Sequence, residues 1–197
     1  MKFLVVGSTG LIGSYVAKTL SKHGTVIGVS RTTQISVDVK DPASIKAMYE
    51  KVGKVDAVAS CIGKVAFKPI AELTYEDYLM GLKDKALGQV ELVRAGIDFL
   101  NDGGSFTLMT GVLARDPIPA GSVAALANGA TESFTLAAAI DLPRGLRINT
   151  VSPNVLVEAT SYHASFPGFH QVTAQSVADA YVKSILGKQT GQIYKLD

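Results

Sequence analysis

The sequence is poor in the residues that mark several specialised classes of protein. Cys61 is the only cysteine, and tryptophan is absent. An internal disulfide is therefore impossible, and the cysteine usage gives no sign of an oxidising compartment. One cysteine and three scattered histidines provide no metal-ligand spacing, so we expect no metal site.

The chain also has no marked excess of positive or negative charge and no long apolar run. Lys and Arg number 19 against 17 Asp and Glu, and the charges are scattered, which gives no argument for binding nucleic acid or an anionic membrane. The N-terminal segment MKFLVVGSTG is too short for a signal peptide. No uninterrupted apolar stretch approaches the ~20 residues of a membrane helix. We therefore expect a cytoplasmic protein that binds neither nucleic acid nor membrane.

The composition that remains is that of a globular protein. Hydrophobic residues make up 47% of the chain and charged residues 18%, which excludes a disordered chain. A length of 197 residues is enough for one substantial core and short for two. We therefore expect a single domain over residues 1–197.

Short apolar runs alternate with helical patterns along the whole chain. The predicted strands are 2–7, 25–30, 35–39, 55–63, 104–111, 146–154 and 191–197. The predicted helices are 11–24, 41–53, 74–100, 122–142 and 174–187. This alternation predicts an α/β fold, with a three-layer, doubly wound, Rossmann-like parallel sheet of about seven strands. Ligands bind at the carboxyl edge of such sheets, where the irregular segment 156–173 should emerge.

The segment GSTGLIGS joins the first strand to the first helix. Gly7, Gly10 and Gly13 leave a backbone that a dinucleotide pyrophosphate can approach, beside the free N–H groups of a helix N-terminus. The alternative is a tight turn that binds nothing. A phosphate loop of the nucleotide-hydrolase type is disfavoured, because no Lys-Ser or Lys-Thr pair follows the glycines. The position after a first strand favours a dinucleotide.

The end of the second strand indicates which dinucleotide. An acid there binds the ribose hydroxyls of NAD, whereas a base accommodates the 2′-phosphate of NADP. The strand ends in Ser30 and Arg31, followed by Thr32, with no acid. Arg31 can hold a phosphate with two parallel hydrogen bonds, and its neighbours offer hydroxyls. We therefore predict NADP(H) rather than NAD, the alternative being that Arg31 is a solvated surface base.

Motifs along nearly the whole chain resemble those of the short-chain dehydrogenase/reductase family. They are GSTGLIG, VDV at 37–39, CIG at 61–63, PRGLRINTVSP at 143–153 and the terminal TGQIYKLD. The resemblance implies hydride transfer between a nicotinamide and a carbonyl or alcohol, in a homodimer or homotetramer. It implies cofactor contacts from Gly7, Ser8, Thr9, Gly10, Leu11, Ile12, Gly13, Ser30, Arg31, Thr32, Asp38, Val39, Cys61, Ile62, Gly63, Asn128, Pro153, Asn154 and Val155.

The chain departs from the family at the catalytic residues. The family uses a Tyr as proton donor, a Lys four residues later, a Ser that holds the substrate oxygen and an Asn that supports a water relay. An ungapped reading places these on Ala124, Asn128, Gly111 and Lys85. Residues 118–134 contain neither Tyr nor Lys. The family's usual proton donor is therefore missing, although cofactor binding does not depend on it.

Other side chains are candidates to replace these groups. Thr110 could orient a substrate oxygen, although a hydroxyl is no acid near neutral pH. Lys85 could bring a cation whose pKa burial lowers, and Asn128 could bond a ribose hydroxyl. A lid residue, Tyr162 or His163, is a less favoured acid, and Cys61 reads as a small buried hydrophobe.

Two functions therefore remain open. The first is an NADP(H)-dependent oxidoreductase with an altered proton donor, or with protonation by water, acting on a carbonyl or alcohol that the sequence does not identify. The second is a catalytically degenerate NADP(H)-binding module that acts as a sensor or through protein partners. The missing Tyr and Lys favour the second, and the fold and length favour the first.

Overall fold

A parallel sheet of six strands, in the order β2-β1-β3-β4-β5-β6, forms the centre of the computed structural model, which describes residues 1–197. The strands are β1 (Lys2–Val6), β2 (Thr25–Val29), β3 (Val55–Ser60), β4 (Leu100–Met109), β5 (Arg147–Pro153) and β6 (Ile193–Leu196). All neighbouring strands are parallel, and β1 pairs with both β2 and β3. The winding therefore reverses between β1 and β3, as in the doubly wound sheet that the sequence predicts.

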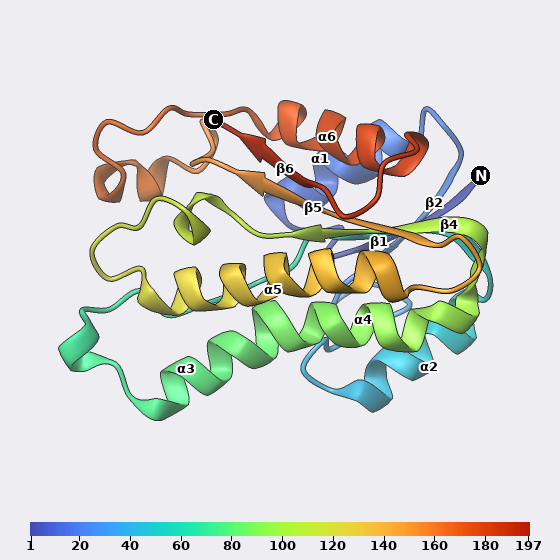
Figure 1. Ribbon diagram of the computed structural model, residues 1–197, viewed down its shortest axis with the longest axis horizontal. Coiled ribbons are helices and arrows are strands. Elements are labelled where there is room, and N and C mark those ends of the chain that lie inside the picture. The colour runs from blue at the N-terminus through green and yellow to red at the C-terminus, as the bar shows by residue number, and fades with distance from the viewer.

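Helices cover both faces of the sheet (Figure 1). One face carries α1 (Leu11–Leu20) and α6 (Ala174–Leu186), and the other carries α2 (Pro42–Val52), α4 (Gly88–Gly96) and α5 (Ser122–Asp141). A hydrophobic cluster fills the space on each side, and successive residues of β1 alternate between the two, Phe3 in one and Leu4 in the other. Burial on both faces explains why the strands read as continuous apolar runs.

Local signals in the sequence determine where several helices begin. Asp41 accepts a hydrogen bond from the N–H of Ala43 and precedes Pro42, the first residue of α2. Thr74 and Asp77 form a reciprocal capping box at the start of α3 (Tyr75–Gly81). By contrast, α1 has no side-chain cap and no acid in its first turn. Its first N–H groups therefore remain available to a ligand.

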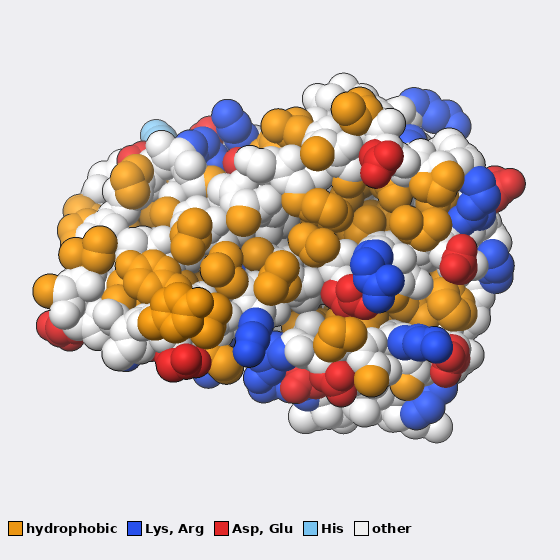
Figure 2. Space-filling view, turned by 60° about the horizontal axis from the view of Figure 1, so that its bottom comes forward, with side chains coloured by type: hydrophobic (Ala, Val, Ile, Leu, Met, Phe, Trp, Pro, Cys, Tyr) orange, Lys and Arg blue, Asp and Glu red, His pale blue; other side chains and the backbone are white.

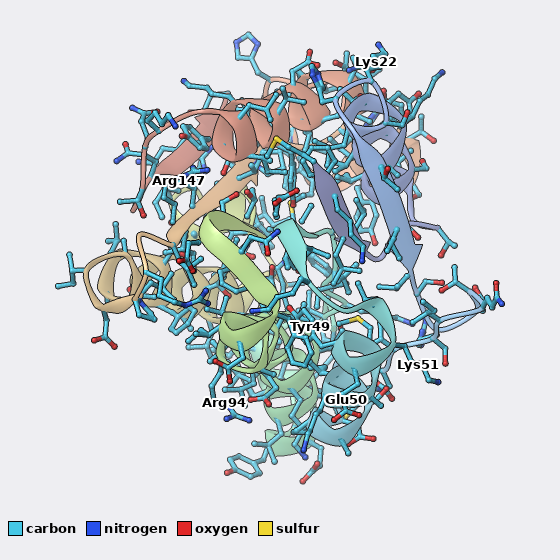
Figure 3. All side chains as sticks on the ribbon, turned by 90° about the vertical axis from the view of Figure 1, so that its right-hand side faces the viewer. Lys22, Tyr49, Glu50, Lys51, Arg94 and Arg147 are labelled. Atoms are coloured by element: carbon cyan, nitrogen blue, oxygen red, sulfur yellow. The ribbon has the colours of Figure 1, made fainter.

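The amino end of the sheet is packed core. Tyr49 of α2 is buried, stacks on Phe99 with ring centroids 5.2 Å apart, and donates a hydrogen bond to the carbonyl of Leu92 at 2.7 Å. Figure 3 views the molecule from this end and shows Tyr49 pointing inward, while Lys22 and Lys51 lie at the periphery. Burial raises the pKa of Tyr49 above its ordinary value. The side chains packed at this end of the molecule therefore stabilise the fold.

Residues 35–39 do not form the predicted third strand. They contact the extension of β2 only at an isolated bridge between Ser30 and Ser36. The Thr33 hydroxyl accepts from the Ser30 N–H and lies 2.8 Å from the carbonyl of Ile35, while Asp38 accepts from the Lys40 N–H. Side chains thus take backbone groups that a strand ladder would use. The prediction of about seven strands is one too many.

The predicted helix over 74–100 is interrupted. A π-helical segment, Leu82–Leu87, separates α3 from α4, and β4 already begins at Leu100. The buried Gln89 amide donates to the carbonyls of Lys85 and Met109, both at 2.8 Å, and accepts from the Met109 N–H. These bonds tie the wider turn to the end of β4. Such π-helical turns are frequent at functional sites.

The long helix α5 is turned with its polar side towards the sheet. Thr131 and Thr135 are buried, and the Thr135 hydroxyl lies 2.6 Å from that of Thr150 on β5. Leu136 and Ile140, by contrast, are 55% and 92% exposed. The helix is long and apolar enough to cross a membrane by length and composition alone, with 33% of that stretch buried here. Leu136 and Ile140 therefore lie on the outside, whereas Val123 of the same helix is buried.

Candidate functional site

Two adjoining cavities open at the carboxyl edge of the sheet. Segments 61–74, 110–121 and 154–173 gather at this edge (Figure 1). The first cavity, of about 300 Å³, lies at the ends of β1, β2 and β3, next to the point where the winding reverses. The second, of about 310 Å³, lies at the ends of β3, β4 and β5. Gly63 and Lys64 line both cavities, so the two meet there.

Most of the residues predicted to bind a cofactor line one of these cavities. Those around the first are Gly7, Thr9, Gly10, Ser30, Arg31, Thr32, Asp38, Val39, Cys61, Ile62 and Gly63. Those around the second are Ile12, Gly63, Asn128, Pro153, Asn154 and Val155. Ser8, Leu11 and Gly13 line neither, and the Ser8 hydroxyl instead lies 3.4 Å from the carbonyl of Val29. The structure thus brings most of the predicted set together, and their cofactor contacts stay predictions.

The three glycines of the first turn have different surroundings. A Cβ on Gly13 would lie 2.0 Å from the carbonyl oxygen of Gly7. Gly7 itself has a φ of +84°, and a Cβ there would lie 2.6 Å from the carbonyl oxygen of Cys61. A Cβ on Gly10 would meet only the Gly7 oxygen, at 3.4 Å, and Gly10 borders the first cavity. The protein's own packing requires Gly7 and Gly13, whereas Gly10 leaves a space that the protein does not fill.

Arg31 belongs to a cluster of three bases. Lys40 and Lys64 line the first cavity with it, and all three also line a neighbouring cavity of about 330 Å³. Arg31 forms no ion pair, and the nearby Asp84 accepts from the Lys64 N–H at 2.8 Å. Sequence reasoning singled out Arg31 and missed both lysines. The cluster is suited to an anionic group such as a phosphate.

Asn128 carries an unpaired acceptor beside the second cavity. The residue is buried, its Nδ2 donates to the carbonyl of Gly111 at 3.3 Å, and its Oδ1 has no partner. A buried polar atom without a partner costs about 1–3 kcal/mol. A hydroxyl of a bound molecule that donates to Oδ1 would remove this cost.

Lys85 lies where the two cavities meet. It belongs to the π-helical segment, and its side chain packs on Gly63, where a Cβ would lie 2.6 Å from Cγ and 3.0 Å from Nζ of the lysine. The ammonium forms no ion pair or hydrogen bond within the protein. Burial lowers the pKa of Lys85 to about 8, against the opposing effect of the charge on Asp84. The side chain is therefore a cation at neutral pH and a neutral amine at moderately alkaline pH.

Thr110 borders the second cavity, but its hydroxyl hydrogen is engaged elsewhere. Its Oγ1 donates to Oε1 of Glu132 at 2.8 Å, and Oγ of Ser152 donates to the same oxygen at 2.9 Å. Arg115 in turn donates to the Ser152 hydroxyl at 2.8 Å and pairs with Asp197. Thr110 therefore presents lone pairs, and not its hydrogen, to the cavity.

The remaining candidates have lesser parts in this arrangement. Ala124 is buried and forms part of the wall of the second cavity, and Tyr162 lies at its mouth. His163 lies outside the lining, with Nε2 2.9 Å from the carbonyl of Leu156. Burial raises the pKa of Cys61 to about 12, which makes its thiol a poor nucleophile. No group of three or more His, Cys, Asp or Glu residues is arranged to hold a metal ion.

Several solved structures resemble this chain. A protein of Listeria innocua is 48% identical, with full coverage of both chains and a TM-score of 0.98. A small-chain dehydrogenase in complex with NADPH is 26% identical, with a TM-score of 0.89, over 100% of this chain and 96% of that chain. These likenesses extend over the whole fold.

Sequence relatives point the same way. The hydroxynaphthalene reductase of Aspergillus fumigatus is 25% identical, and the match covers 76% of this chain and 64% of that protein. A short-chain dehydrogenase/reductase of Pestalotiopsis microspora is 26% identical over 87% of this chain and 76% of that protein. A family model described as enoyl-(acyl carrier protein) reductase matches residues 10–191. With the doubly wound sheet, the glycine turn and this match over nearly its whole length, the chain belongs to the short-chain dehydrogenase/reductase family.

Proposed function

We propose that the protein is an NADP(H)-dependent oxidoreductase that reduces a carbonyl compound, with Lys85 as the proton donor. The observation that carries the proposal is the position of the Lys85 ammonium, which packs on Gly63 where the two cavities meet. The likeness to a dehydrogenase in complex with NADPH, and to relatives named as reductases, supports the class of cofactor and reaction.

The residues around the first cavity fit NADP(H). The uncapped N-terminus of α1 and the open space at Gly10 suit a pyrophosphate. The three bases, Arg31 foremost, suit the 2′-phosphate that NAD lacks. The unpaired Oδ1 of Asn128 suits a hydroxyl of the nicotinamide ribose. When bound, NADPH would supply the hydride.

The polar groups of the second cavity have different parts in the proposed reaction. Lys85 is a donor, whereas Thr110 Oγ1 and Asn128 Oδ1 present lone pairs. As a carbonyl oxygen gains negative charge, the ammonium of Lys85 donates a proton to it and becomes a neutral amine. A pKa of about 8 suits this step, because the lysine is protonated at neutral pH yet releases its proton more readily than an ordinary lysine. In the reverse direction the neutral amine accepts the proton of an alcohol.

The test is to compare Lys85→Met with Lys83→Met, a control that removes an exposed lysine two residues away. Initial rates of NADPH oxidation would be measured with neutral aldehydes and ketones between about pH 6 and pH 10. We expect the reduction rate to fall as pH rises through about 8, because Lys85 then loses its proton. Lys85→Met should lower kcat about 100-fold or more, the usual worth of a general acid, and leave the Kd for NADPH nearly unchanged. Lys83→Met should keep the wild-type rate and profile.

The outcomes separate the two functions that the sequence leaves open. A Lys85→Met protein with wild-type rates and pH profile would remove Lys85 from the reaction. Tight binding of NADPH without consumption by any carbonyl would favour the alternative, a binding module that acts as a sensor or through protein partners.

We also propose that the protein is a homodimer formed through α5. Leu126, Leu136 and Ile140 are exposed on this helix, and Figure 2 shows hydrophobic side chains gathered on the face that carries it. The helix is otherwise rich in Ala and Gly, which permits another helix to approach closely. Contiguous apolar patches of this kind on the surface of a protein are typical of sites of association.

A further inference from the structure

The walls of the second cavity are apolar. Eleven of its 19 lining residues are hydrophobic, and no carboxylate is among them. Its charged members are Lys64 and Lys85, and both lie at the junction with the first cavity. Beyond that junction a substrate meets no charged partner. Because an unpaired charge is costly to bury, this part of the cavity disfavours a charged substrate.

Aromatic rings from two segments close the mouth of this cavity. Phe67, from segment 61–74, and Tyr162, from segment 154–173, lie with ring centroids 6.0 Å apart and planes inclined by 56°. Phe166 also lines the cavity and is held edge-on by Phe169, with centroids 5.2 Å apart. Phe67 and Tyr162 are still 40% and 49% exposed. A flat apolar ligand would cover these ring surfaces, and tilted rings are a favourable contact for another aromatic ring.

The size of the cavity and its surroundings limit the substrate further. A volume of about 310 Å³ lies at the lower end of the ~300–1,000 Å³ usual for ligand sites. A substrate held on a carrier as a thioester brings a phosphate group with it, and this phosphate must lie at the mouth of the second cavity. The nearby Lys68, next to Phe67 in sequence, is already paired with Asp77 at 3.0 Å, so this base is not free to bind that phosphate. Where the family's Tyr would stand, the methyl group of Ala124 adds to the apolar wall.

Resting on the proposed reduction of a carbonyl, we infer that the substrate is a small, neutral aromatic ketone or aldehyde. Its ring packs against Phe67, Tyr162 and Phe166, and its oxygen lies at Lys85. Charged metabolites and acyl thioesters fall outside this class.

The test compares turnover with binding that needs no turnover. With NADPH, kcat/KM for 2-tetralone, a neutral ketone fused to an aromatic ring, should exceed that for pyruvate or acetoacetyl-CoA at least about tenfold, the worth of one or two ring contacts. Phe67→Ala and Tyr162→Ala should each raise KM about fivefold to tenfold with little change in kcat. Ile70→Ala and Tyr75→Ala are matched controls, since both side chains are exposed outside the cavity lining. Calorimetric titration of 2-naphthol into the protein saturated with NADP⁺ measures the ring site directly.

Each result bears on one proposal. Faster turnover of pyruvate or acetoacetyl-CoA than of 2-tetralone would overturn the substrate class and leave the reductase proposal standing. Binding of 2-naphthol that Phe67→Ala weakens, without turnover of any carbonyl, would retain the aromatic site and refute the reductase. Absence of 2-naphthol binding, or equal binding by the Phe67→Ala protein, would overturn the aromatic site.

Discussion

Replacing Gly10 by alanine distinguishes what a ligand needs from what the fold needs. The backbone at Gly10 is extended, with φ −77° and ψ 170°, which alanine adopts without strain. A Cβ there would approach only the carbonyl oxygen of Gly7, at 3.4 Å. Gly10→Ala should therefore change the free energy of unfolding by less than about 1 kcal/mol. Gly13→Ala would place a methyl 2.0 Å from the same oxygen, and overpacking of this kind costs about 1–3 kcal/mol or more.

The same methyl group should interfere with NADPH. It would project into the space that the first cavity leaves for a pyrophosphate at the start of α1. If the overlap costs about 1–3 kcal/mol, the Kd for NADPH rises roughly 5- to 150-fold, since 1.4 kcal/mol is a factor of ten. The assays are a titration of NADPH fluorescence and a thermal melt. Gly129→Ala is a suitable control, because a Cβ there meets no atom within 4 Å.

For the prediction to hold, Gly10→Ala must weaken NADPH binding while leaving the melting temperature nearly unchanged. Wild-type NADPH affinity in a folded Gly10→Ala protein would show that no phosphate rests against this turn. A Gly10→Ala protein that melts as early as Gly13→Ala would show that all three glycines serve only the packing of strand and helix.

Three further changes test other parts of the site and surface. The wild-type protein should bind NADPH at least about tenfold more tightly than NADH, and Arg31→Leu should remove most of that difference; equal dissociation constants in the wild type would contradict this. Thr110→Val should reduce kcat more than it weakens NADPH binding, because it removes the acceptor for the hydroxyl of the alcohol and one of the two hydrogen bonds that hold Glu132; unchanged kinetics would take Thr110 out of the site. Ile140→Asp together with Leu136→Asp should yield a monomer in sedimentation equilibrium, and a monomeric wild type would refute the dimer.

Much of the fold could be predicted because its determinants are local in the sequence. Strands buried on both faces leave continuous apolar runs, and capping residues such as Asp41 and Thr74 mark where helices begin. The error at 35–39 has a physical reason, since side-chain hydrogen bonds from Thr33 and Asp38 override the apolar pattern. The π-helical turn escaped notice because the buried Gln89 that ties it to β4 reads in sequence as an ordinary polar residue.

Residues of the site could be predicted only where their positions could be counted from a recognised family motif, which sets the register. Counting from that register placed Lys85 and Asn128, and the structure puts both on the second cavity. Lys64 is distant in sequence from Arg31, and Lys40 lies beyond the segment 35–39 that the sequence predicts as a strand, so only the fold brings the three bases together. Glu132 was also missed, although it lies one helical turn after Asn128 and so shares its face. That spacing was the signal that could have found it.

The residues Ala124 and Asn128 on α5 and the proposed use of Lys85 are chemically connected. A phenol that donates a proton leaves an anion, so the family's Tyr needs the charge of a neighbouring Lys to work near neutral pH. An ammonium that donates a proton leaves a neutral amine, which an apolar cavity tolerates without a partner. One lysine can therefore do the work of the pair, and neither Ala124 nor Asn128 needs to be charged. Because the π-helical segment that carries Lys85 contacts α5 directly, the proposed donor would stand on a neighbouring helix, and the space that a phenol would fill would be left to the proposed substrate.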